Sequence, residues 1–195
     1  MKELLEHFLK ALDAALLASA SATARLDLYA IGRSALILHH GLNLPPGGTK
    51  DLDVIQTQHP PSALLATALD LFGKGTANAG KYGVYLEPVP LGLPPVPGWF
   101  DRRCTETRGD WRVLRLWQLE VHDLAATKLK SFRPQDRLDL QFLCDRGTLR
   151  AEALQESLNH AFIWSTPKDG DPDYDRAFAN LERVIRYLEG GISSL

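Results

Sequence analysis

The sequence predicts an α+β protein, in which a small mixed β-sheet flanked by helices is followed by a helical half. Two features of its 195 residues support this fold class. Short segments with alternating or branched apolar residues, as strands have, all lie before residue 120. After residue 122, apolar residues recur every three or four positions, as in amphipathic helices. We therefore expect a sheet-containing part at 1–98 and a mainly helical part at 99–195 packed on it, or one continuous domain.

Helices and strands alternate in the first half. Residues 1–20 place leucines and Phe8 on one stripe, which predicts an amphipathic helix. Alternation predicts strands at 26–31, 51–55 and 84–89. The helices expected between them, one ended by a glycine and one opened by proline, are 33–40 and 60–72. Segments rich in glycine or proline predict loops at 41–50 and 73–83.

The second half opens with a proline-dense segment, residues 88–99. We interpret it as a stiff extended linker rather than a docking motif for a proline-reading partner. A fourth strand is predicted at 111–119, from its branched and aromatic residues. The remaining apolar periodicity predicts helices at 123–132, 134–145, 150–162 and 174–189.

Composition argues against several classes of protein. The formal net charge of −2 gives no overall attraction to nucleic acid or to an anionic membrane. No apolar run is long enough to span a bilayer. Charged residues interrupt the apolar stretch at the N-terminus, so we expect a helix of the mature protein there and not a signal peptide. Cys104 and Cys144 lie far apart without metal-ligand spacing, which favours thiols in a reducing cytoplasm.

Two aspartates within an apolar strand, Asp51 and Asp53, are the most informative feature. Alternation places both on one face of the strand, with Leu52 and Val54 on the other. Neighbouring carboxylates repel each other, and partial burial strengthens the repulsion. A solvated edge can tolerate such a pair, and a bound cation can make it favourable. We favour the cation, because hard carboxylate oxygens are the ligands that Mg²⁺ prefers.

The residues upstream of this strand suit a phosphate. Gly32 allows a ligand to approach the backbone closely. The N-terminus of helix 33–40 offers unpaired N–H groups and the positive end of the helix dipole, and Ser34 adds a hydroxyl donor. A metal at Asp51 and Asp53 beside this helix end would fit a nucleoside triphosphate.

These residues also carry a family resemblance. The stretch GRSALILHHGLNLPPGGTKDLDVI resembles the signature of the DNA polymerase β-like nucleotidyltransferases, in which a glycine followed by glycine or serine opens a helix and Asp-x-Asp follows on the next strand. More narrowly, the run Thr49-Lys50-Asp51-Leu52-Asp53 is similar to that of the AbiEii-type abortive-infection toxins and their uncharacterised bacterial relatives. Two later segments, LAATKLKSF and RPQDRLDLQFL, resemble the lysine motif and the Asp-x-x-Asp motif of the family.

The resemblance implies a nucleotidyltransferase palm and a role for each matching residue. Asp51 and Asp53 would be catalytic ligands of Mg²⁺, and Glu87 would be the third carboxylate, because no other acid lies on a predicted strand in that interval. Lys128 would contact phosphate. The implied nucleotide-binding residues are Gly32, Arg33, Ser34, Thr49, Lys50, Lys128 and Asp136, with Asp139 completing the last motif. Arg33 departs from the family pattern, although an arginine can itself hold phosphate.

Plain structural roles stay open for several residues. Glu87 precedes Pro88 at a strand end, where it can be a surface residue. Lys128, taken without the resemblance, is expected to be solvated on a helix surface. Asp136 lies in the first turn after Pro134, where a carboxylate favours the helix dipole. We expect His39 and His40 at a helix end rather than as ligands. A solvated face is expected for the arginines Arg102, Arg103, Arg108, Arg112 and Arg115. Packing roles are expected for the tryptophans Trp99, Trp111, Trp117 and Trp164.

The predicted function is Mg²⁺-dependent transfer of a nucleoside monophosphate from an NTP to an acceptor hydroxyl. The acceptor would be tRNA or another RNA, a protein or a small molecule. The resemblance also suggests a cytoplasmic bacterial protein of toxin type with an antitoxin partner. Two alternatives stay open: a degenerate palm that binds nucleotide or regulates a partner, and a purely structural interaction domain. The Glu87 carboxylate separates them, because catalysis requires it beside Asp51 and Asp53.

Overall fold

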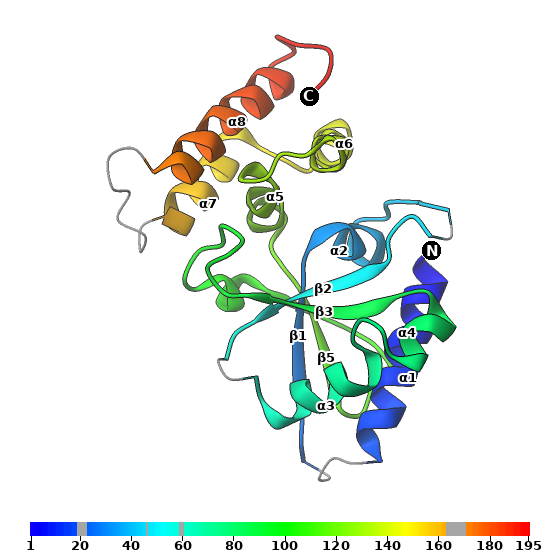
Figure 1. Ribbon diagram of the computed structural model, residues 1–195. Coiled ribbons are helices and arrows are strands. Elements are labelled where there is room, and N and C mark those ends of the chain that lie inside the picture. The colour runs from blue at the N-terminus through cyan, green and yellow to red at the C-terminus, as the bar shows by residue number, and fades with distance from the viewer. Residues whose placement is uncertain (19–22, 46, 59–60, 163–170) are drawn as a thin grey trace. The chain divides into compact units, whose positions relative to one another are not determined.

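A computed structural model describes residues 1–18, 23–45, 47–58, 61–162 and 171–195 and confirms the α+β class (Figure 1). The chain divides into two compact units. The sheet unit comprises Met1–Leu91 and Thr105–Gln118, and the helical unit comprises Gly92–Cys104 and Leu119–Leu195. The two units are therefore interleaved along the sequence, because strands that follow residue 98 belong to the sheet unit.

Five strands form one mixed sheet in the order β3-β2-β1-β5-β4. Their bounds are β1 Leu26–Ala30, β2 Asp51–Gln56, β3 Tyr85–Pro90, β4 Thr105–Thr107 and β5 Leu114–Gln118. Strand β1 is antiparallel to β2 and parallel to β5, while β3 is parallel to β2 and β4 is antiparallel to β5. One face is apolar, with four leucines at most 1% exposed: Leu28, Leu52, Leu86 and Leu116. Strand alternation sends Asp51, Asp53 and Glu87 to the opposite face.

Three helices of the sheet unit lie next to one another (Figure 1). They are α1 (Lys2–Leu17), α3 (Ala63–Phe72) and α4 (Ala77–Tyr82). The Phe8 ring of α1 meets Phe72 edge to face at 5.4 Å and Tyr82 at 6.0 Å between ring centroids. The short helix α2 (Gly32–His39) buries Leu36 and Ile37. This core follows from the amphipathic stripe of α1.

A buried carboxylate, Asp13, ties α1 to the start of β5. Its oxygens accept hydrogen bonds from the backbone N–H groups of Arg112, Val113 and Leu114, at 2.7–3.1 Å. Four such bonds compensate for the loss of hydration of a buried charge. The sequence pattern of α1 did not predict this anchor, because its partners lie about one hundred residues away.

The helical unit is built from α5 (Val121–Leu129), α6 (Pro134–Asp145), α7 (Ala151–Phe162) and α8 (Pro172–Leu188). Each contributes apolar side chains that are at most 3% exposed, and these include Leu124, Leu140, Leu154 and Leu181. The starts are capped by local side chains, as when the Glu120 carboxylate accepts from the N–H groups of His122 and Asp123. The predicted bounds of α6 are confirmed, with Pro134 at its first position.

The structure corrects several expectations about connecting segments. The predicted loop 73–83 contains α4, which the Thr76 hydroxyl caps by accepting from the N–H of Ala79. Two short elements were missed, the edge strand β4 and a 3₁₀ turn, η1 (Phe100–Arg103). Residues 94–97 of the proline-dense segment are buried, so that part is not an exposed linker. Trp164, expected in packing, lies outside the described residues.

Within the described part of the chain, none of the helices combines the length and the apolar character needed to cross a membrane.

Candidate functional site

Three carboxylates meet on the polar face of the sheet. Asp51 and Asp53 lie two residues apart on β2, and Glu87 lies directly opposite Asp53 on the neighbouring strand β3. One oxygen from each residue lies within 4.8 Å of the others, and all three side chains are partly buried. The register of β3 against β2 therefore brings Glu87 to the two aspartates. We call this group the carboxylate site.

The chemistry of the carboxylate site suits a divalent cation. Three like charges at this separation repel one another, and partial burial weakens the screening by water. A hard cation bound between them would remove the repulsion, and carboxylate oxygens are its preferred ligands. The arrangement can therefore hold a metal, with Asp51, Asp53 and Glu87 as its protein ligands.

Gly32 allows the turn before α2 to pass directly against Asp53. Its φ of +67° is left-handed, and a Cβ at this position would overlap Oδ2 of Asp53 and lie 3.3 Å from its Cγ. The adjacent N–H of Ile31 donates to the backbone carbonyl of Asp53 at 2.9 Å. Any larger residue at position 32 would displace either the turn or the Asp53 carboxylate.

Thr49 orients the other aspartate. Its buried hydroxyl lies two residues before the start of β2 and donates to Oδ1 of Asp51 at 3.0 Å. Hydrogen bonds of this kind fix the rotamer of a ligand before the metal arrives. The Thr-x-Asp-x-Asp pattern therefore has a local structural meaning, because the threonine holds the first aspartate in place. Lys50, between them, is exposed.

The start of α2 is more enclosed than the sequence suggests. Ser34 is fully buried, and its hydroxyl donates to the carbonyl of Ile31 at 3.1 Å. The Ser34 hydroxyl hydrogen is therefore already used within the first turn of the helix. The donors that remain for a ligand are the backbone N–H groups of that turn. Arg33 is half-buried beside it.

Tyr85 is a member of this region that the sequence analysis did not single out. It pairs with Asp51 in the register of β2 and β3, and its hydroxyl donates to the Glu87 carboxylate. Burial raises the pKa of the Tyr85 phenol above its ordinary value, and the charges of Glu87 and Asp51 act in the same direction. The signal was present in the sequence, because Tyr85 lies two residues before Glu87 on one strand and shares its face.

Lys128 lies in the helical unit, and it is buried rather than solvated as the sequence suggested. Only 4% of the residue is exposed. Its ammonium lies 2.8 Å from Oδ2 of Asp139 and 3.7 Å from Oδ1 of Asp136. The helix surface predicted from α5 alone is covered by α6, which carries both aspartates. We call Lys128, Asp136 and Asp139 the lysine cluster.

Asp136 has the capping role that its position predicted. Its Oδ2 accepts from the backbone N–H of Arg133 at 3.0 Å and from the Ser131 hydroxyl at 2.8 Å. The carboxylate therefore satisfies a donor at the start of α6 and stands near the positive end of the helix dipole.

Comparison with known proteins gives one match. The model of a family described as "nucleotidyltransferase of unknown function (DUF6036)" matches residues 7–176. No curated protein and no solved structure matches the chain. The matched range includes parts of both units, among them the carboxylate site and the lysine cluster.

Proposed function

The chain belongs to the DUF6036 family of nucleotidyltransferases, and from this premise we propose that it transfers a nucleoside monophosphate from an NTP to an acceptor hydroxyl with the help of Mg²⁺. One observation carries the proposal. Asp51, Asp53 and Glu87 lie on paired strands with an oxygen of each within 4.8 Å of the others. Phosphoryl-transfer sites use such groups of carboxylates to hold the cation that neutralises the triphosphate.

In the proposed reaction, the acceptor oxygen bonds to the α-phosphorus and the bond to pyrophosphate breaks. Glu87, the third carboxylate of the site, helps to accept the proton of the attacking hydroxyl. Mg²⁺ held by the three carboxylates would supply charge neutralisation and an activated attacking oxygen. Thr49 keeps Asp51 in the orientation that binds the cation.

The start of α2 would position the triphosphate. The turn at Gly32 passes against Asp53, so the N–H groups of residues 32–34 stand beside the carboxylate site. A helix N-terminus favours phosphate through these donors and its dipole. Arg33 and Lys50 would add positive charge. Lys128 and Asp136, to which the resemblance assigns a contact with the nucleotide, belong to the lysine cluster, where they lie 3.7 Å apart.

The acceptor is proposed as an RNA such as tRNA, a protein or a small molecule. A toxin of the AbiEii type with an antitoxin partner is the biological form that the resemblance suggests. Incubation with each α-labelled NTP, Mg²⁺, total RNA and lysate fractions would identify the acceptor by the molecule that takes up the label.

The test of the reaction compares two isosteric substitutions. Asp53→Asn removes a proposed metal ligand and should abolish label transfer. Asp70→Asn removes the same charge from an exposed position on α3 and should leave transfer unchanged. If the wild type binds NTP and Mg²⁺ but labels no acceptor, the chain is a nucleotide-binding or regulatory module instead. Equal transfer by both variants would refute the assignment of Asp53.

A further inference from the structure

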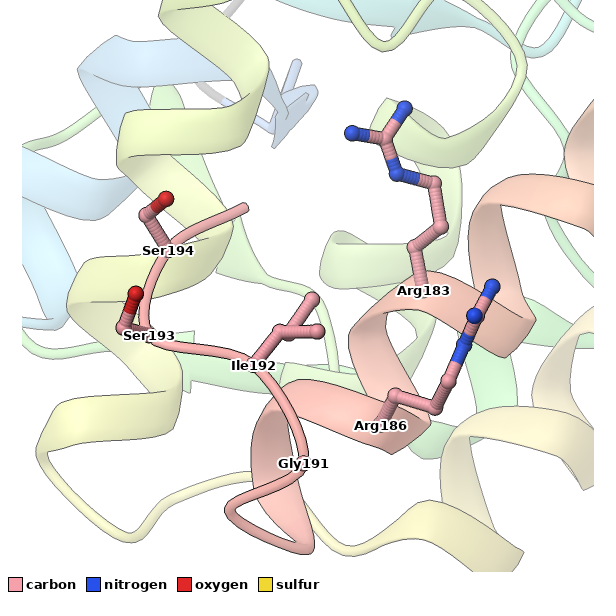
Figure 2. Close-up of a pocket in the computed structure, with 6 residues that line it drawn as sticks. All are labelled: Arg183, Arg186, Gly191, Ile192, Ser193 and Ser194. Atoms are coloured by element: carbon pink, nitrogen blue, oxygen red, sulfur yellow. The ribbon is translucent and has the colours of Figure 1, made fainter.

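The helical unit contains a hollow with a volume of about 490 Å³, beside the C-terminal part of α8. It is lined by six residues: Arg183, Arg186, Gly191, Ile192, Ser193 and Ser194. Figure 2 shows the two arginines extending from neighbouring turns of α8, and Ile192 facing them from the segment that follows the helix. The chain reverses there at Gly190, whose φ is +75°, and the N–H of Gly191 donates to the carbonyl of Arg186.

The two guanidinium groups give this hollow its charge. Arg183 and Arg186 are three residues apart and so share one side of α8. Glu182 and Glu189 lie nearby on the same stretch of chain, yet in the described part of the protein neither arginine forms an ion pair with a carboxylate. Both positive charges are therefore available to a ligand.

Arg183 is also held in place by a strained neighbour. Its guanidinium carbon lies 5.4 Å from the centre of the Phe132 ring. Phe132 follows α5 with a φ of +45°, and it is the one residue other than glycine with a left-handed φ among those described. This conformation is strained for a bulky residue. The Phe132 ring lies against the arginine, and stacking of this kind limits the freedom of a guanidinium group.

We propose that this hollow binds phosphate groups of a nucleic-acid strand. Guanidinium forks match the oxygens of phosphate in geometry and charge. None of the six lining residues is aromatic, so the hollow offers no aromatic ring on which a base would stack. A sugar–phosphate backbone fits this lining better than a nucleotide recognised by its base.

This proposal concerns the helical unit alone and does not depend on the transfer reaction. Both could fail separately, because the carboxylate site and the hollow share no residue.

The experiment measures binding of a short fluorescent single-stranded RNA by polarisation at low salt, with inorganic phosphate and ATP as competitors. Arg186→Gln should weaken RNA binding about tenfold or more, because it removes a charge-assisted contact with phosphate. Arg183→Gln should act in the same direction. The matched control is Arg176→Gln, which removes one exposed charge from the same helix and should change binding less than about twofold. Thermal unfolding of each variant checks that the fold is retained.

Three outcomes would overturn the proposal in whole or in part. If the wild type binds neither RNA, ATP nor phosphate, the hollow is not a phosphate site. If Arg176→Gln weakens RNA binding as much as Arg186→Gln, the effect is one of general charge. If ATP or phosphate binds through Arg183 and Arg186 while RNA does not, the phosphate chemistry stands and the nucleic-acid strand is rejected as its source.

Discussion

The carboxylate site gathers three charges of one sign, whereas the lysine cluster combines charges of both signs. In the helical unit, the buried ammonium of Lys128 lies 2.8 Å from Asp139, and Asp136 also accepts a backbone N–H and a hydroxyl. In the sheet unit, three carboxylates of like charge crowd on one face. A balanced cluster can stabilise a fold. A crowded one costs stability, which indicates that it is kept for binding or catalysis.

The largest expected effect tests the structural role of the lysine cluster. Lys128→Ala leaves the Asp139 carboxylate buried without its cation, and should lower the free energy of unfolding by about 3–5 kcal/mol. Lys130→Ala is the control, because this partly exposed lysine pairs with Asp173 at 2.9 Å on the surface and should cost less than about 1 kcal/mol. Urea denaturation measures both. Similar losses in the two variants would show that the buried pair contributes little.

This result also decides how nucleotide binding by Lys128 variants is interpreted. The sequence predicted Lys128 on a solvated helix surface, where a substitution costs little stability. Its burial removes that assumption, so a loss of NTP binding counts as a lost contact only where the variant remains folded at the temperature of the assay.

The next largest effect is the dependence of the free energy of unfolding on pH. Burial lowers the pKa of His39, at the end of α2, from 6.5 to about 4, and the charges of His40 and Lys2 act in the same direction. The unfolded chain therefore binds the proton more tightly than the folded chain does. The stability contribution is complete above pH 6.5 and is lost as the pH falls towards 4, by about 3 kcal/mol in total.

Unfolding free energies of the wild type and of His39→Gln, measured across this pH window, check the prediction. The free energy of unfolding of the variant should fall less at acid pH than that of the wild type, because the variant lacks the His39 imidazole. His7→Gln replaces an exposed histidine of α1 and should keep the wild-type profile. An unchanged profile in His39→Gln would mean that His39 titrates alike in the folded and unfolded chains.

The smallest expected effect tests whether the crowding in the carboxylate site costs stability. Without divalent cations, Asp53→Asn should raise the free energy of unfolding by up to about 1 kcal/mol, because one of three repelling charges is removed. Added Mg²⁺ should then raise the melting temperature of the wild type but not of the variant. Asp70→Asn should respond to Mg²⁺ as the wild type does. A destabilised Asp53→Asn that lacks any Mg²⁺ response would still assign metal binding, but it would contradict the stability cost.

Local patterns in the sequence were sufficient to predict much of the sheet unit. The alternation in 51–55 placed Asp51 and Asp53 on one face, and the structure shows that face carrying the carboxylate site. Gly32 was expected to let a ligand approach the backbone closely, and the group that lies against it in the structure is the Asp53 carboxylate. The start of α6 at Pro134 was also predicted, because proline favours the first turn of a helix. The alternation in β2 and the start of α6 both depend on residues that are neighbours along the chain.

The features that the sequence did not determine depend on contacts between distant segments. Glu87 reaches the aspartates only because β3 pairs with β2 in one particular register, and a shift of one residue would turn its side chain to the opposite face. Lys128 lies on a helix whose exposed side can be recognised from periodicity, but α6 covers it and supplies its partners. Asp13 interrupts the apolar stripe of α1, and no residue close to it in the sequence explains why. Its carboxylate accepts hydrogen bonds from the backbone N–H groups of residues 112–114. Periodicity reports which face of an element is apolar, whereas the element that covers the other face is decided only when the whole chain has packed.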